Sequence, residues 1–277
     1  MSGSAHRERP GIVEDEPRPG WSSEHAHRAA EMLESAWRRG ALIDRLPAGC
    51  TPGSFDEGYT IQASLAERVG TSFGWKIAAT SSAGQRHIAV NRPLAGRLFT
   101  RYVIEDGGRL SVSEGNMHML VAEAEFAFRI GTAHASPGGR PRDWAADLHL
   151  AIELPDSRFA SFVTAGGPQL VADNACGSHF VLGPPVPGWK DADLVAQAVF
   201  VRVNGVEVAS GSGRNVLTGP LDALDWLADE LTRHGEELRP GDVVTTGVAT
   251  LPVPISAGDH VVAEFPSMGS VSVRLGA

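Results

Sequence analysis

Cysteine is scarce in this chain of 277 residues, which contains Cys50 and Cys176 and no other cysteine. A pair so widely separated makes neither a disulfide framework nor a CxxC metal site, so we expect reduced thiols and a cytoplasmic protein. Long apolar runs are also missing. No stretch approaches the roughly 18 residues of a transmembrane helix, and the N-terminus has no apolar signal-peptide region. We therefore expect no association with a membrane.

Positive charge is in the minority, because 24 Lys and Arg residues stand against 33 Asp and Glu residues. The net charge of −9 and the pI near 5.6 predict a surface that repels nucleic-acid phosphates, so we expect no nucleic-acid partner. Hydrophobic residues, in contrast, make up 42% of the chain. This content is enough for a full-sized core, either in one large domain or in a main domain with a small helical lead-in.

The chain divides into three parts by pattern. Residues 1–22 mix proline, glycine and charge without periodicity, as is typical of a disordered leader. Residues 23–70 have the periodicity of two helices, the first ending at Gly40 and the second at Gly70. Residues 71–277 contain short strands separated by glycine turns, among them a hairpin predicted at Asn204-Gly205, with one clear helix in PLDALDWLADELTRHG. Strands and helices are segregated, which predicts an α+β fold dominated by sheet.

Two strands of this pattern carry glutamates where a buried strand would have aliphatic residues. In VAEAEFAFRI, the alternation of side chains puts Glu123 and Glu125 on the face opposite the apolar residues. In LHLAIEL, Glu153 likewise lies opposite four aliphatic residues. One interpretation is an amphipathic sheet with a solvated face. The other is an all-oxygen ligand set for Mg²⁺ or Mn²⁺, since neighbouring carboxylates repel one another unless a cation or solvent lies between them.

Several motifs occur in an order that resembles a known family. They are GWKIAATSSAGQRHIAVNRPLAGRLF, EAEFAF, ELPDSRF, VADNACGSHFVLG, GPLDALDWLADEL and GDHVVAEFPSMGSVSVRL. Over residues 25–277 the chain resembles the 2-keto-4-pentenoate hydratase and 4-oxalocrotonate decarboxylase branch of the fumarylacetoacetate hydrolase superfamily. Each motif is short and weak alone, and the order of all six carries the resemblance.

The resemblance implies a fold, a metal and an assembly. The fold would be a mixed β-roll of the fumarylacetoacetate hydrolase C-terminal type, forming the catalytic domain over residues 71–277 behind the helical region of residues 23–70. The E-x-E strand and the glutamate before D-S-R would bind Mg²⁺ or Mn²⁺ through Glu123, Glu125 and Glu153. Family members form homo-oligomers, so we expect a homo-oligomer here, with a complex with a pathway enzyme as a further expectation.

The implied reaction is the addition of water to a 2-hydroxy-2,4-dienoate, giving a 4-hydroxy-2-oxo acid, in the breakdown of aromatic or related compounds. The metal would stabilise the enolate oxygen as a Lewis acid, and no organic cofactor is needed. Lys76 in GWKI matches the family's G-[FYW]-K lysine and would move the proton. Because it would be partly desolvated or near a metal, we expect its pKa to fall toward neutrality. Without the resemblance, a solvated lysine at a strand end is the simpler interpretation.

Further site candidates lie in neighbouring motifs. The resemblance puts the VADN loop close to the active site, which makes Asp173 a catalytic candidate and Asn174 a substrate-binding candidate, although turn-forming Asx residues explain the loop equally well. Arg158 could pair with a substrate or ligand carboxylate, or form a structural salt bridge. Thr80 and Ser81 could donate hydrogen bonds to a substrate carboxylate.

One departure from the family pattern leaves the activity open. In RPLAG, Leu94 occupies the position of the aspartate in the family's P-D-[FY]-G, which puts the partner of Lys76 or the accepted substrate tail in doubt. A 2-oxo-3-enedioate decarboxylase of the 4-oxalocrotonate type would need the same metal ligands and lysine. A catalytically silent metal-binding homologue or partner subunit is the alternative from another class. The carbon–carbon hydrolase branch carries a His-Glu pair on a short helix that has no counterpart here.

Overall fold

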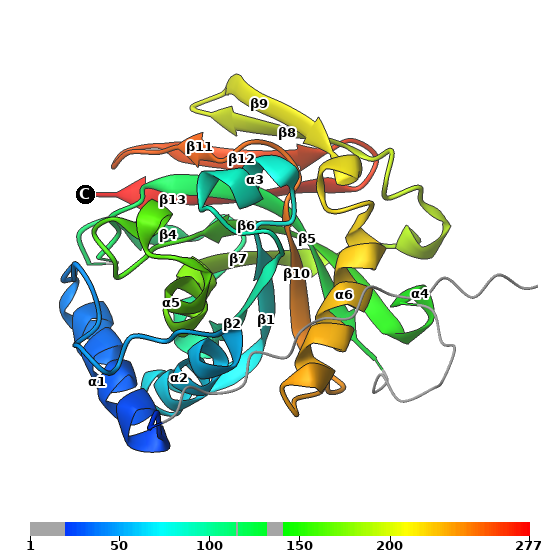
Figure 1. Cartoon of the computed structure of the whole chain (residues 1–277). Coiled ribbons are helices and arrows are strands. Elements are labelled where there is room, and N and C mark those ends of the chain that lie inside the picture. Colours follow the sequence, from blue (N-terminus) through cyan, green and yellow to red (C-terminus); the bar gives the residue numbers. More distant parts are fainter. Residues whose placement is uncertain (1–19, 115, 132–140) are drawn as a thin grey trace, which may run out of the picture.

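The computed structural model describes residues 20–114, 116–131 and 141–277, and two sheets lie at the centre of this part (Figure 1). Of the predicted leader, residues 1–22, only residues 20–22 are described. The fold is α+β with mixed sheets, as the sequence predicted.

The larger sheet has eight strands in the order β2-β1-β10-β5-β6-β7-β3, and β11 pairs with β5 beside this path. Two of its pairs, β1 with β10 and β3 with β7, are parallel, and the others are antiparallel. Its strands are β1 (Ser72–Ala78), β2 (Leu94–Phe99), β3 (Val103–Glu105), β5 (Val121–Ile130), β6 (Ala145–Leu154), β7 (His179–Pro185), β10 (Val243–Val248) and β11 (Val253–Pro254).

The second sheet has five strands in the order β4-β13-β12-β8-β9 and packs across the larger sheet. The ring of Phe126 on β5 meets that of Phe265 edge to face, with centroids 5.1 Å apart, so the apolar face of β5 forms the core between the sheets. The strands are β4 (Arg109–Ser111), β8 (Ala198–Val203), β9 (Val206–Ser212), β12 (His260–Phe265) and β13 (Gly269–Gly276).

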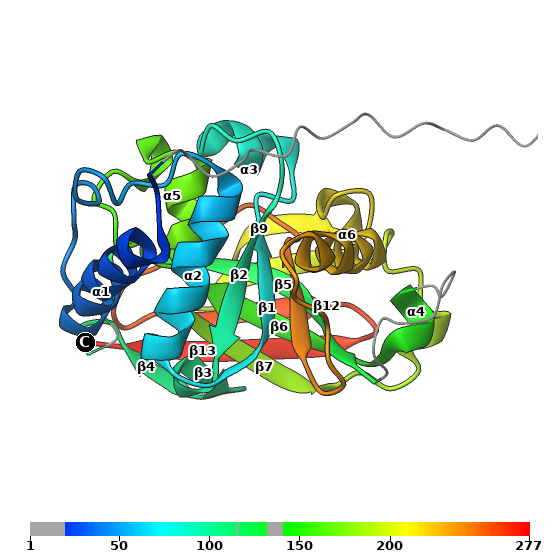
Figure 2. The ribbon, with the colours of Figure 1, turned by 60° about the horizontal axis from the view of Figure 1, so that its bottom comes forward.

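The helices lie around the larger sheet (Figure 2). Helix α2 packs between α1 and α5, and α6 packs on β10. The helices are α1 (Ser23–Arg39), α2 (Phe55–Val69), α3 (Ser82–His87), α4 (Pro141–Trp144), α5 (Gly167–Ala172) and α6 (Pro220–Arg233). Short 3-10 turns are η1 (Thr100–Tyr102), η2 (Phe162–Thr164), η3 (Asn174–Cys176), η4 (Trp189–Asp191) and η5 (Gly213–Asn215).

The local patterns account for these elements. Helix α1 buries one stripe of residues at helical spacing, namely Ala26, Ala29, Ala30, Leu33, Ala36 and Trp37. Ser54 caps α2, because its hydroxyl accepts a hydrogen bond from the Glu57 N–H at 3.2 Å. Asn204 and Gly205 both have positive φ and join β8 to β9 in the predicted hairpin.

The predicted helical region shares its core with the sheet. Leu33 of α1 and Leu65 of α2 belong to one apolar cluster that also includes Phe99 at the end of β2 and Phe159. The helices therefore rest on the larger sheet and on the segment after β6. The boundary between residues 23–70 and a catalytic domain over residues 71–277 stays a prediction.

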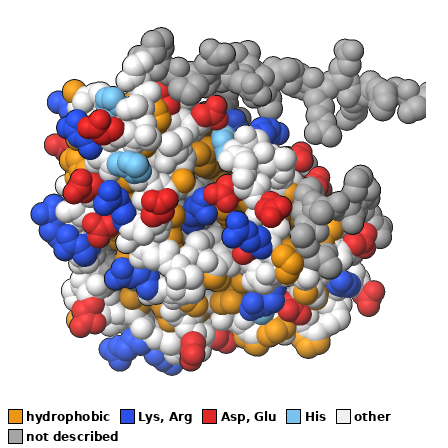
Figure 3. Space-filling model, turned by 90° about the horizontal axis from the view of Figure 1, so that it is seen from below, with side chains coloured by type: hydrophobic (Ala, Val, Ile, Leu, Met, Phe, Trp, Pro, Cys, Tyr) orange, Lys and Arg blue, Asp and Glu red, His pale blue; other side chains and the backbone are white. Residues whose placement is uncertain are grey.

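Charges of both signs are mixed on the surface seen in Figure 3, with apolar side chains between them. The described residues on this face form no continuous basic patch, in keeping with the net charge of −9. No helix in the described part of the chain is both long and apolar enough to span a membrane.

Candidate active site

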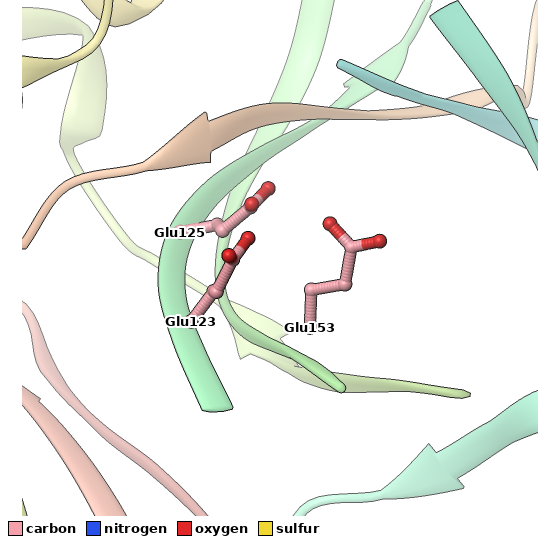
Figure 4. A group of neighbouring side chains, drawn as sticks. All are labelled: Glu123, Glu125 and Glu153. Carbon is pink, nitrogen blue, oxygen red and sulfur yellow. The ribbon is translucent and has the colours of Figure 1, made fainter. Parts of the chain in front are cut away.

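The three glutamates singled out by alternation meet on one side of the larger sheet (Figure 4). Glu123 on β5 lies directly opposite Glu153 on β6, and Glu125 is two residues further along β5. One carboxylate oxygen from each lies within 4.8 Å of the others. Glu125 is 0% exposed and Glu153 is 1% exposed, while Glu123 is half-buried. The interpretation of a solvated sheet face is therefore wrong.

Burial and mutual repulsion shift the ionisation of this cluster. Burial, followed by repulsion from Glu153, raises the pKa of Glu123 to about 7. The same causes, with repulsion from Glu123 added, raise the pKa of Glu125 well above its ordinary value. Burial also raises the pKa of Glu153, while the nearby Lys76 ammonium lowers it. The cluster lacks enough positive charge to keep three carboxylates ionised.

The unsatisfied oxygens of this cluster fit a divalent cation. Glu125 Oε2 accepts a hydrogen bond from the Gly247 N–H at 3.0 Å, but Glu125 Oε1 and Glu153 Oε2 are buried without a hydrogen-bond partner among the described residues. Buried carboxylate oxygens are normally paired or bound to metal. A set of three oxygen ligands with space beside it suits Mg²⁺ or Mn²⁺.

Lys76 on β1 is the cation that faces these carboxylates. Its Nζ lies 3.1 Å from Glu153 Oε1 and donates a hydrogen bond to the Ala175 carbonyl at 3.0 Å, and the side chain is 2% exposed. Burial lowers the pKa of Lys76, but attraction to Glu153, Glu123 and Glu125 outweighs it, so the pKa is raised. The expectation that this pKa falls toward neutrality is wrong for the metal-free chain, because sequence spacing does not reveal three carboxylates around one ammonium.

Glycine on β2 allows this lysine to be buried. Gly96 pairs with Lys76 across the sheet, and a Cβ at Gly96 would lie 2.3 Å from the Asn174 carbonyl oxygen and 3.1 Å from Lys76 Cδ. Any other residue there would displace the turn that accepts the lysine's hydrogen bond. Sequence reasoning missed Gly96, since one glycine in a strand has no distinctive pattern.

The turn that follows α5 is strained. Asn174, Ala175 and Cys176 have φ of 54°, 49° and 60°, in the left-handed region that non-glycine residues rarely adopt. This conformation presents the Ala175 carbonyl to Lys76 Nζ. Ala175 and Cys176 both line the cavity described below. Burial, with Asp173 nearby, raises the pKa of the Cys176 thiol to about 12, so this thiol is not a nucleophile.

Two predicted site residues pair with each other away from the cavity wall. The Arg158 guanidinium forms a buried ion pair with Asp173, which also accepts a hydrogen bond from the Ser157 hydroxyl at 2.6 Å. Burial raises the pKa of Asp173, while Arg158 opposes the rise. These contacts favour the structural salt bridge, one of the two alternatives left open for Arg158. The catalytic role of Asp173 and the substrate contact of Arg158 stay predictions.

Asn174 joins the turn to β2. Its Oδ1 accepts a hydrogen bond from the Arg97 N–H at 2.7 Å, and its Nδ2 donates one to the Arg97 carbonyl at 2.9 Å. Both ends of the amide are therefore occupied by backbone, and Asn174 holds the turn in place. Its predicted contact with substrate remains a prediction.

A cavity of about 510 Å³ adjoins the charged cluster. Lys76, Glu123, Thr80 and Ser81 are among the residues that line it. Thr80 is 3% exposed, and its hydroxyl has no hydrogen-bond partner among the described residues. The Ser81 hydroxyl accepts a hydrogen bond from the Gly84 N–H at 3.0 Å and so caps α3. The structure brings Thr80, Ser81, Lys76 and the glutamates to one site.

The sequence around this site matches the model of a known protein family. Residues 91–275 match the model described as fumarylacetoacetate (FAA) hydrolase C-terminal. The chain belongs to the fumarylacetoacetate hydrolase family. Strands β5 and β6, which carry the three glutamates, lie within the matched residues. The resemblance noted from the six motifs is confirmed.

The relatives of this chain include proteins named as hydratases and proteins named as decarboxylases. The chain is 33% identical over 256 residues to 2-keto-4-pentenoate hydratase 1 of Dechloromonas aromatica, covering 88% of this chain and 94% of that protein. It is 30% identical over 252 residues to 4-oxalocrotonate decarboxylase of Pseudomonas putida, with the same two coverages.

A solved structure of a relative has the same fold. The 4-oxalocrotonate decarboxylase of Pseudomonas putida G7, complexed with magnesium and adipate, superimposes with a TM-score of 0.84 at 28% identity. The match covers 92% of this chain and 98% of that one. A second structure of that enzyme, complexed with calcium and acetate, superimposes with a TM-score of 0.81.

Proposed function

We propose that this chain is a hydratase that depends on Mg²⁺ or Mn²⁺ and adds water to a 2-hydroxy-2,4-dienoate of the 2-keto-4-pentenoate type. The observation that carries the proposal is the buried Lys76 ammonium, 3.1 Å from a carboxylate of the cluster beside a cavity. A lysine and three clustered oxygen ligands suit an acid whose negative charge moves onto its C2 oxygen during reaction. The relatives named as hydratases support the same class of reaction.

Each residue has a definite task in this proposal. Glu123, Glu125 and Glu153 would hold the cation, which would supply Lewis acidity at the C2 oxygen. Lys76 carries the proton from the enol oxygen to C5, which leaves a 2-oxo-3-enoate. Water then adds across the double bond, with hydroxyl to C4 and hydrogen to C3. The unpartnered Thr80 hydroxyl donates a hydrogen bond to the substrate carboxylate.

Decarboxylation of a 2-oxo-3-enedioate is the second candidate, and one observation favours it. A neighbouring cavity of about 580 Å³ shares Thr80 and Ser81 with the first and contains Arg214. A guanidinium there could hold a second carboxylate. Relatives named as decarboxylases give the same alternative. A homo-oligomer, a complex with a pathway enzyme and a cytoplasmic location remain expectations.

The proposal is tested with chelator-stripped protein and 2-hydroxypenta-2,4-dienoate. We expect the ultraviolet absorbance of the dienol to disappear only when Mg²⁺ or Mn²⁺ is added, and the product mass to rise by one water. Loss of carbon dioxide from 2-hydroxyhexa-2,4-dienedioate, without hydration of the monoacid, would support the decarboxylase instead. Thermal stabilisation by metal without turnover of either acid would indicate a catalytically silent homologue.

A further inference from the structure

The cavity is larger than the simplest substrate of the proposed reaction requires. Liquid water takes about 30 Å³ per non-hydrogen atom, so the roughly eight such atoms of 2-hydroxypenta-2,4-dienoate need no more than about 240 Å³. The cavity volume is about 510 Å³. More than half of the space would remain for a substituent after this acid is bound.

The part of the wall next to Lys76 is apolar. Lys76 pairs with Gly96 and Ala78 pairs with Leu94 between β1 and β2, so Lys76 and Leu94 lie on the same face of the sheet. Leu94 is 1% exposed and lines the cavity. It contributes apolar surface on the face of the sheet that carries Lys76.

Segments from elsewhere in the chain complete this wall. Ile88 follows α3, Phe162 begins η2 and Leu170 lies in α5, and all three line the cavity. Leu251 also lines it and is 68% exposed. These four side chains and Leu94 are here called the apolar wall.

The cavity offers no free cation to a second carboxylate. Among the described residues that line it, the charged side chains are Lys76 and Glu123, and His87 is the one histidine. Lys76 is already paired with Glu153 and hydrogen-bonded to Ala175. A carboxylate bound against the apolar wall would lose its hydration, and the one imidazole among these lining residues, His87, is exposed, with its ring centroid 6.0 Å from that of Phe162. Arg214 lies in the adjoining cavity, beyond the shared Thr80 and Ser81.

We propose that the apolar wall binds a bulky, uncharged substituent, such as an aromatic ring, on C5 of a monocarboxylic substrate. This inference rests on the proposed function, since the acid end of the substrate must lie at the glutamate cluster and Lys76. Leu94, Ile88, Phe162 and Leu170 determine specificity by excluding water from the substituent. The preferred substrate is then a 2-hydroxy-2,4-dienoate with one carboxylate and a large apolar group on C5.

Binding of unreactive analogues tests the inference apart from turnover. With Mg²⁺ present, calorimetry would compare 2-oxopentanoate, 2-oxo-5-phenylpentanoate and 2-oxohexanedioate, which differ only in hydrogen, phenyl or carboxylate on C5. We expect the phenyl compound to bind at least about tenfold more tightly than the parent, and the dicarboxylate no more tightly than the parent. Equal binding of phenyl compound and parent would overturn the inference and leave the proposed function standing. Failure of all three to bind would overturn both.

Substitutions in the apolar wall test whether the phenyl group binds there. Ile88→Ala and Phe162→Ala change half-buried side chains, so both variants should fold, and each should reduce the ratio of phenyl to parent affinity by about threefold or more. Val206→Ala on β9, exposed at 65%, is the matched control and should leave the ratio unchanged. If the dicarboxylate bound most tightly and Arg214→Ala removed that preference, the adjoining cavity would hold the substituent and the inference would be wrong.

Discussion

Ionisation of Glu123 should destabilise the metal-free chain as the pH rises. A carboxyl group whose pKa is higher in the folded than in the unfolded chain favours folding while it is protonated, and loses that contribution as the pH rises through the folded pKa. The pKa of Glu123 rises from 4.5 to about 7 because of burial and repulsion from Glu153. The decline in stability therefore falls between about pH 4.5 and 7.

The size of this decline follows from the pKa difference. At about 1.4 kcal/mol for each pH unit, full ionisation of Glu123 lowers the free energy of unfolding by at most about 3 kcal/mol. Solvent reaches this half-buried side chain, so we expect about 1–3 kcal/mol. The raised pKa values of Glu125 and Glu153 add in the same direction, whereas Lys76 keeps its proton over this range. In a chain of 277 residues, this corresponds to a fall in Tm of about 3–10 °C.

Thermal unfolding at pH 5 and pH 8, with chelator or with Mg²⁺, measures this effect. Glu123→Gln keeps the shape of the protonated group and should reduce the pH-dependent fall in Tm in chelator, leaving the part due to Glu125 and Glu153, and it should lose much of the stabilisation by Mg²⁺ at pH 8. Glu207→Gln on β9, where the glutamate is 44% exposed, is the control and should behave as wild type. A Glu123→Gln variant with the wild-type fall in Tm and the wild-type response to Mg²⁺ would refute the reasoning.

Two further substitutions separate catalysis from folding. Lys76→Met should reduce kcat by about 100-fold or more without weakening Mg²⁺ binding, because the proton carrier is lost while a positive charge is removed from beside Glu153. Turnover and a calorimetric Mg²⁺ titration check this, and turnover within tenfold of wild type would contradict it. Asp173→Asn leaves the buried Arg158 without its counter-ion and should lower the free energy of unfolding by about 3–5 kcal/mol in urea denaturation, while Mg²⁺ still raises Tm. Unchanged stability with lost turnover would instead indicate that Asp173 acts on the substrate.

Much of the local structure could be predicted from the sequence. The buried stripe of α1 and the turn at Asn204 and Gly205 follow from short-range patterns, and both occur as expected. Alternation also separated Glu123 and Glu125 from the core face of β5, because successive strand side chains point to opposite faces. Whether that second face met solvent or a closed site could not be predicted, since burial depends on what packs above the sheet.

The arrangement of the site depends on register and topology. The pairing of Glu123 with Glu153 and the approach of Lys76 to Glu153 require β1, β5 and β6 to lie in one sheet with a particular register. Gly96 and the strained turn at Ala175 matter because they meet Lys76 from other segments. For the metal-free chain, the raised pKa of Lys76 was not predicted for the same reason: a sum of charges in space cannot be obtained from distance along the chain.

By itself, the sequence determined the three longest helices, the strand faces, the order of the motifs and the identity of the three glutamates, because these depend on neighbouring residues and on residue chemistry. Tertiary structure alone decided that the glutamates are mutually close, that Lys76 is paired with Glu153, and that Arg158 and Asp173 bind each other. It also decided that Leu94 faces a cavity larger than a five-carbon acid. Contacts between distant segments set each of these properties, through burial and through Coulomb interactions that act over distance in space.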